Sequence, residues 1–136
     1  MKSPHLLRVE EGPERFAPLI EAARAEGLRV GWLDLAPPPP MAGDLETAAA
    51  AGVLRAVAVG GDRSVVVKPL RGAPVLQDLL REHFRGTALV LVRGELEAPL
   101  LRWVGEEWEV TVPGQAAVRL ETGRLVPALR KPRPWA

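Results

Sequence analysis

Charged side chains able to bind a ligand stand at the ends of two apolar runs. Asp34 lies near the end of the run at 28–35, and Arg93 follows the most apolar run, at 88–92, with Glu95 two residues later. Open α/β sheets bind ligands beyond the carboxyl ends of parallel strands. We therefore predict Asp34, Arg93 and Glu95 as ligand-binding residues. A surface ion pair of Arg93 with Glu95 or Glu97 is the interpretation we favour, and Asp34 could also pair with it.

Three acidic residues near the N-terminus form a second candidate group. Glu10, Glu11 and Glu14 could chelate a hard cation, but acidic residues beside a helix N-terminus more often complement the helix dipole. The chain has no cysteine and two histidines, and no serine or threonine carries a nucleophile signature. We therefore predict no catalytic residue, no metal site and no cofactor.

Tryptophans give the C-terminal third a different character. Trp103, Trp108 and Trp135 lie there among several arginines. They could stack on bases or on a pterin. Core packing combined with a protein–protein anchor is the interpretation we favour, because tryptophan and arginine are enriched at binding hot spots. Trp103 and Trp108 are the predicted interface residues, and the apolar hairpin strand at 64–70, an edge that must be covered, is the alternative interface.

The bulk composition narrows the classes of function. The 136 residues carry a net charge of +1, which argues against a nucleic-acid partner. No run of 18 apolar residues is present, so we expect no membrane partner and a cytoplasmic location. Abundant proline and the absence of asparagine suit a thermophile.

The helices and strands expected to position these residues are those of an α/β protein, starting with a βαβ unit. A strand at 5–9, a helix at 14–26 and a strand at 28–35 form a βαβ unit, which implies parallel strands. A polyproline connector at 37–40 and a helix at 44–51 follow. The remaining expected elements are a hairpin of strands 53–59 and 64–70, a helix at 74–84, a strand at 88–92, short strands at 103–105 and 108–112, and a hairpin of 117–120 with 124–126. We expect one domain over 1–129 and a loose tail over 130–136.

The order of these segments resembles the MobB family, small P-loop GTP-binding proteins accessory to molybdopterin guanine dinucleotide synthesis. The resemblance is carried by Gly-Leu-Arg-Val-Gly at 27–31, an Asp-led helix ending in Ala-Gly at 44–52, the hairpin region at 57–72, and Leu-Val-Leu-Val-Arg-Gly at 89–94. It covers about residues 5–100. It implies a P-loop-NTPase-like, mostly parallel sheet with flanking helices, followed by a small β-rich C-terminal part.

The matching loop at 10–17 lacks the groups that hold a nucleotide. A P-loop needs glycines, a lysine for the phosphates and a hydroxyl for Mg²⁺. Phe16 stands at the lysine position, Ala17 at the hydroxyl position, and three glutamates lie where phosphates would bind. Arg93 and Thr87-Ala88 replace two acidic residues of the family pattern. The resemblance therefore implies a degenerate member that neither binds nor hydrolyses nucleotide.

We therefore expect a non-hydrolysing accessory or protein-interaction domain, linked through the family to molybdenum cofactor biosynthesis. Its expected partner is a second copy, forming a homodimer, or a molybdenum-cofactor biosynthesis protein. The alternative is a module that binds a small molecule or anion at the carboxyl edge of the sheet. A third possibility is an enzyme of a new type on the same scaffold, but the sequence shows no set of catalytic residues that supports it.

Overall fold

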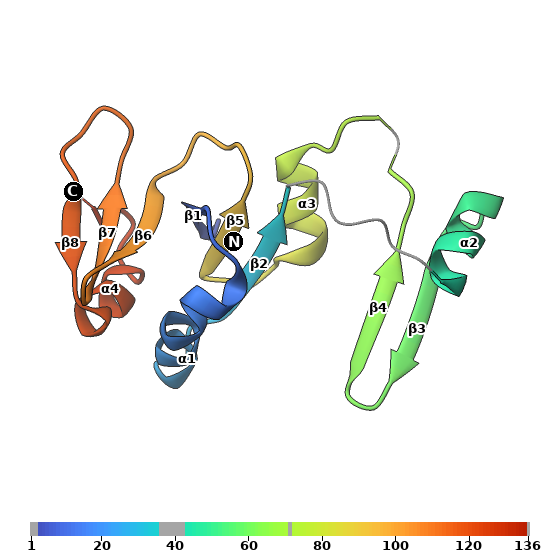
Figure 1. The fold of residues 1–136 in the computed structure, drawn as a ribbon, viewed down its shortest axis with the longest axis horizontal. Helices are drawn as coiled ribbons and strands as arrows, with labels where there is room; N and C mark the ends of the chain where they lie inside the picture. Colours follow the sequence, from blue (N-terminus) through green and yellow to red (C-terminus); the bar gives the residue numbers. More distant parts are fainter. Residues whose placement is uncertain (1–2, 36–42, 71, 136) are drawn as a thin grey trace. The chain divides into compact units, whose positions relative to one another are not determined.

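The computed structural model describes residues 3–35, 43–70 and 72–135, which form two compact units. The first unit contains residues 3–35 and 82–135, and the second contains 43–70 and 72–81 (Figure 1). The polyproline connector expected at 37–40 lies outside the described residues. The single domain expected over 1–129 stays a prediction.

A six-stranded mixed sheet forms the centre of the first unit. Its strands are β1 (His5–Val9), β2 (Val30–Asp34), β5 (Leu89–Arg93), β6 (Leu100–Val104), β7 (Glu107–Thr111) and β8 (Val118–Leu120), in the order β2-β5-β1-β6-β7-β8. The first four run parallel, whereas β7 is antiparallel to both β6 and β8. In β5, residues 89–92 are all buried because both faces of this central strand are covered.

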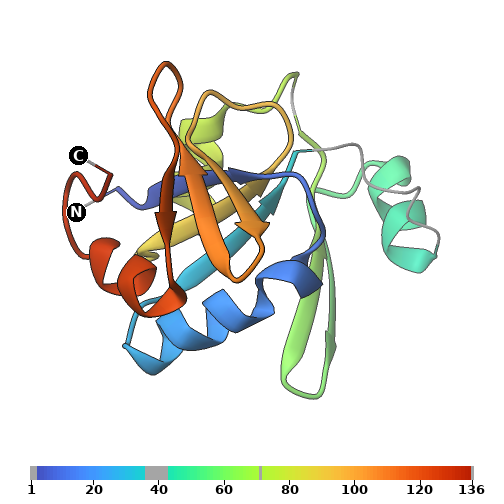
Figure 2. The same cartoon turned by 60° about the vertical axis from the view of Figure 1, so that its left-hand side comes forward.

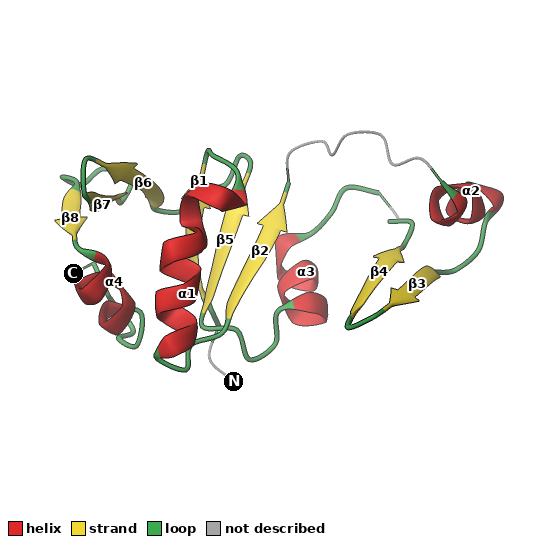
Figure 3. Cartoon of the chain, turned by 60° about the horizontal axis from the view of Figure 1, so that its bottom comes forward, coloured by secondary structure: helices red, strands yellow, loops and turns green. Residues whose placement is uncertain are grey.

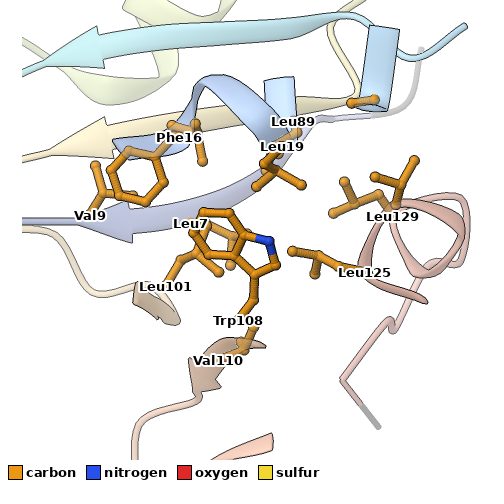
Figure 4. Packing of buried hydrophobic residues seen from close by; sticks show 13 residues of the cluster. Leu7, Val9, Phe16, Leu19, Leu89, Leu101, Trp108, Val110, Leu125 and Leu129 are labelled. Atoms are coloured by element: carbon orange, nitrogen blue, oxygen red, sulfur yellow. The ribbon is translucent and has the colours of Figure 1, made fainter. Parts of the chain in front are cut away.

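Two helices pack on one face of this sheet (Figure 2). A 3-10 turn, Pro13–Phe16, leads into α1 (Ala17–Ala25), and α4 (Thr122–Ala128) lies beside α1. Helix α1 ends in a Schellman motif, in which the Leu28 N–H donates to Ala23 O at 2.9 Å and Gly27 adopts a φ of 77°. Figure 4 shows the core between these helices and the sheet, formed by Leu7, Val9, Phe16, Leu19, Ala23, Leu89, Leu91, Leu101, Trp108, Val110, Leu125, Val126 and Leu129.

The second unit is a small α–β hairpin structure. Helix α2 (Asp44–Ala51) contacts an antiparallel hairpin of β3 (Ala56–Gly60) and β4 (Arg63–Val67) (Figure 3). Helix α3 (Leu76–His83) begins in this unit and ends in the first. Gly61 takes a φ of 61° at the hairpin turn, a backbone conformation that favours glycine.

The expected P-loop-like arrangement is wrong. The three C-terminal strands do not form a separate small β-rich part, because β6 pairs with β1 and extends the same sheet into a mixed, β-rich one. The strand expected at 53–59 is β3, which pairs only with β4 among the described strands. The parallel strands expected at 5–9, 28–34 and 88–92 are present, but β5 separates β1 from β2.

Two C-terminal expectations also differ from the structure. Residues 124–126 belong to α4 and do not pair with 117–120. Leu125 and Leu129 are one helical turn apart, so both bury against the core only when this segment is helical. The tail is not loose throughout, because Trp135 packs against the core cluster and Arg130 donates to Glu26 O.

Candidate functional site

The carboxyl ends of β2 and β5 bring two predicted residues together. Asp34 and Arg93 are register neighbours in this parallel pair. The Arg93 Nε donates to Asp34 Oδ2 at 2.9 Å, and Arg93 Nη2 contacts the same oxygen. The guanidinium lies over the Trp32 ring, 5.6 Å from its centroid, because Trp32 and Asp34 share one face of β2. The possible Asp34 pairing is therefore confirmed, whereas no Arg93 ion pair with Glu95 or Glu97 is formed.

The electrostatics of this cluster favour retention of the ion pair. The hydrogen bond to Asp34 raises the pKa of Arg93, desolvation opposes the rise, and the charges of Asp34 and Glu14 add to it. Asp34 and Arg93 are both partly exposed to solvent, with side-chain accessibilities of 30% and 36%. An incoming anion would therefore have to compete with a carboxylate that Arg93 already contacts twice.

Glu95 lies at the rim of a hollow beside this ion pair. Charged residues of both signs line the hollow, namely Arg8, Arg93, Glu10 and Glu95. Glu95 is exposed and forms no ion pair with a described residue. Because Asp34 already compensates Arg93, the acidic side chains outweigh the available positive charge. The arrangement does not favour an anionic ligand.

The loop at 10–17 serves the core of the first unit. Phe16 is only 1% exposed, and its ring stacks on Trp108 at a centroid distance of 5.7 Å and an interplanar angle of 20°. It also contacts Trp32 at 6.1 Å. A lysine at this position would bury an unpaired charge, so the loop residue that departs most from a P-loop is explained by packing.

The acidic residues of this loop do not assemble a cation site. Glu11 pairs with Arg15 at 3.0 Å, and Glu14 lies near Gly12 and Arg93. In the described ranges, no group of three histidine, cysteine or acidic side chains could hold a metal ion. Local ion pairing explains the position of Glu11 without any ligand.

Trp108 and Trp103 have different environments. Trp108 is 1% exposed at the centre of the core, and its Nε1 donates to Thr122 Oγ1 at 2.9 Å (Figure 4). Trp103 is half-buried and meets Trp108 edge-on at 4.8 Å across the β6–β7 pair. Trp108 is thus not on the surface as expected for an interface residue. Core packing, the interpretation favoured from the sequence, describes it instead.

Large apolar side chains are exposed to solvent in the second unit, on the hairpin that includes the predicted interface strand at 64–70. Val57 is 52% exposed, Val59 78% and Val66 51%. Val57 and Val66 are register neighbours on one face of the hairpin, opposite Ala56 and Val67. The sequence signal was the run of valines at 65–67 in β4 and the entirely apolar Ala-Val-Ala-Val of β3, a pattern that predicts burial of both faces. Within this unit that burial is not achieved.

No family model and no curated protein matches this chain. None of the helices in the described ranges has both the length and the apolar character needed to cross a bilayer.

Proposed function

We propose that the chain is an accessory protein-interaction domain that binds no nucleotide and catalyses no hydrolysis. The observation that carries this proposal is the exposed valine surface on one face of the β3–β4 hairpin, defined by Val57, Val59 and Val66. Monomeric proteins rarely expose contiguous apolar patches larger than a few hundred Å², and larger patches mark binding surfaces.

A second copy of the chain is the partner that this hairpin fits best. Among the described strands, β3 and β4 pair only with each other, so each presents an unpaired backbone edge. A two-stranded hairpin needs a helix or further strands against its apolar face for stability. Helix α2 contacts the hairpin but leaves Val57, Val59 and Val66 more than half exposed, so further strands could bury them. Antiparallel pairing of one edge with the same edge of a second copy makes four strands around a two-fold axis. Strand β3 carries no charge that would oppose this pairing.

The loop at 10–17 supports the exclusion of nucleotide from this function. Phe16 is committed to the core, and Glu10, Glu11 and Glu14 surround the place where phosphates would lie in a P-loop. Carboxylates placed next to a polyphosphate repel it, because both carry negative charge.

The resemblance to the MobB family supplies the second partner to test, a molybdenum-cofactor biosynthesis protein. The cytoplasmic location remains a prediction of the sequence. The alternative function, a small-molecule or anion module at the carboxyl edge, has less support because Asp34 already neutralises Arg93 there.

Light scattering at tens of micromolar protein tests the homodimer. We expect a mass near twice the 14.7 kDa of one chain, with a total interface of at least about 1,000 Å². Val57→Asp places a charge on the exposed face of β3 and is expected to shift the mass to that of the monomer.

Val118→Asp provides the matched control, because Val118 is 37% exposed on β8 of the first unit. It should leave the dimer intact. A monomeric wild-type protein would contradict the homodimer, and a dimer lost in Val118→Asp but kept in Val57→Asp would move the interface to β8. Circular dichroism of each variant establishes that it is folded.

A further inference from the structure

A second hollow of the first unit lies at the amino ends of β1 and β5, at the opposite edge of the sheet from Asp34 and Arg93. The chain after α4 runs beside the start of β1 (Figure 2), and its residues 130–132 line the hollow. Its volume is about 670 Å³, within the range of small-molecule sites. The hollow is lined by Ser3, His5, Leu28, Gly86, Thr87, Ala88, Leu129, Arg130, Lys131 and Pro132.

The polar lining of this hollow is basic. It contains Arg130 and Lys131 and no aspartate or glutamate, in a chain whose net charge is only +1. The Arg29 guanidinium lies near Gly86, one of the lining residues, since a Cβ added at Gly86 would be 3.8 Å from Arg29 Nη1. The hydroxyl of Thr87 adds a neutral donor. The positive charge is therefore concentrated here, whereas the hollow beside Arg93 contains both signs.

The two lining cations differ in how they are held. Arg130 Nη2 donates to the main-chain oxygen of Glu26, which ties its guanidinium to the end of α1. Four other N–H groups of that guanidinium remain for a ligand. Lys131 is exposed and forms no ion pair with a described residue. Arg130 and Lys131 both follow α4, where cations complement the helix dipole. Interaction with the dipole alone does not require the Thr87 hydroxyl and the apolar surface that lie beside them.

The other side of the hollow is apolar and belongs to the core. Leu129 is 3% exposed, and Leu28 packs against the core cluster. Ala88 and Pro132 complete this surface. A ligand that fits both sides carries an anionic head and a small apolar body.

We propose that this hollow binds a small organic phosphate. The phosphate is held by Arg130 and Lys131, with Thr87 as an additional donor, and the apolar body rests on Leu28 and Leu129. Phosphate suits this site better than a carboxylate, because two cations and a hydroxyl can serve its three oxygens at once. The site is independent of the hairpin surface proposed above.

Phenyl phosphate is the probe, titrated into the full-length protein and followed by amide chemical shifts. We expect saturable shifts at Thr87 and Lys131, and weaker binding of inorganic phosphate, benzoate and phenol. Lys131→Glu should weaken the binding of phenyl phosphate by about tenfold or more, since it replaces a charge-assisted hydrogen bond with repulsion.

Arg124→Glu is the matched control, because Arg124 is exposed on α4, outside the lining, and the substitution changes the net charge equally. We expect less than about a twofold loss of affinity for it. If no amide shifts appear at phenyl phosphate concentrations up to about 10 mM, the proposed site is overturned. Equal weakening in both variants would show a diffuse charge effect, and benzoate binding as tightly as phenyl phosphate would overturn the phosphate assignment.

Discussion

Truncation of Phe16 to alanine tests whether the loop at 10–17 is a part of the core. The side chain is 1% exposed and stacks on Trp108 at 5.7 Å. Burial of a phenylalanine contributes about 1.5–3 kcal/mol, and the unfilled cavity raises the cost of removing it to about 3–5 kcal/mol. Since domains are stable by about 5–15 kcal/mol, Phe16→Ala should lose a large part of the stability of the first unit.

Urea unfolding followed by tryptophan fluorescence measures this loss. All four tryptophans lie in the first unit with Phe16, so the signal reports that unit. With an m-value of about 1–3 kcal/mol/M, the midpoint should fall by at least about 1 M.

The other phenylalanine of the chain provides the control. Phe84 is half-buried, so Phe84→Ala should cost less than half as much. A loss below about 1 kcal/mol for Phe16→Ala, or equal losses for both variants, would refute the assignment of Phe16 to the core.

Three further predictions concern the same unit. Gly31→Ala should cost about 1–3 kcal/mol, because its Cβ would lie 2.5 Å from Phe84 Cδ1; in urea melts, the cost should shrink when Phe84→Ala is added. Trp108→Phe should cost about 1–3 kcal/mol through loss of the Thr122 hydrogen bond, and circular dichroism melts of Trp108→Phe, Thr122→Val and the double variant should show non-additive losses. Calorimetry with Mg²⁺ and GTP or ATP should show no binding in the millimolar range. Phe16→Lys, which restores the P-loop lysine, should unfold the first unit rather than create a nucleotide site. A micromolar dissociation constant for either protein would contradict this prediction.

Local patterns in the sequence were sufficient for several elements. The bounds of β1 and α2 agree with the predicted 5–9 and 44–51, because each is delimited by turn residues at its ends. The pairing of Asp34 with Arg93 was also accessible, since both residues end strands of one parallel sheet.

Long-range pairing decided what the sequence could not indicate. Strand β6 joins β1 through Arg8 and Leu100, and no local pattern specifies a contact between segments so distant. Residues 124–126 of α4 were predicted as a strand because Leu125 and Val126 form a short apolar run after a turn at 121–123. The benefit of burying Leu125 on a helix arises from the core around Trp108, which no local pattern reveals. The sequence identified Phe16 as unsuited to nucleotide, but its stacking partner lies 92 positions away in the chain, on β7.

The central position of β5 affects how the protein is made. Strand β2 ends at Asp34, and its neighbour in the sheet ends at Arg93, 59 residues later. At a synthesis rate of about 5–20 residues per second, those residues take about 3–12 s to appear. During that interval the nascent chain carries two apolar strands, β1 and β2, whose common partner does not yet exist. Until β5 has emerged, the ribosome-bound chain therefore exposes strand edges of β1 and β2 that favour aggregation.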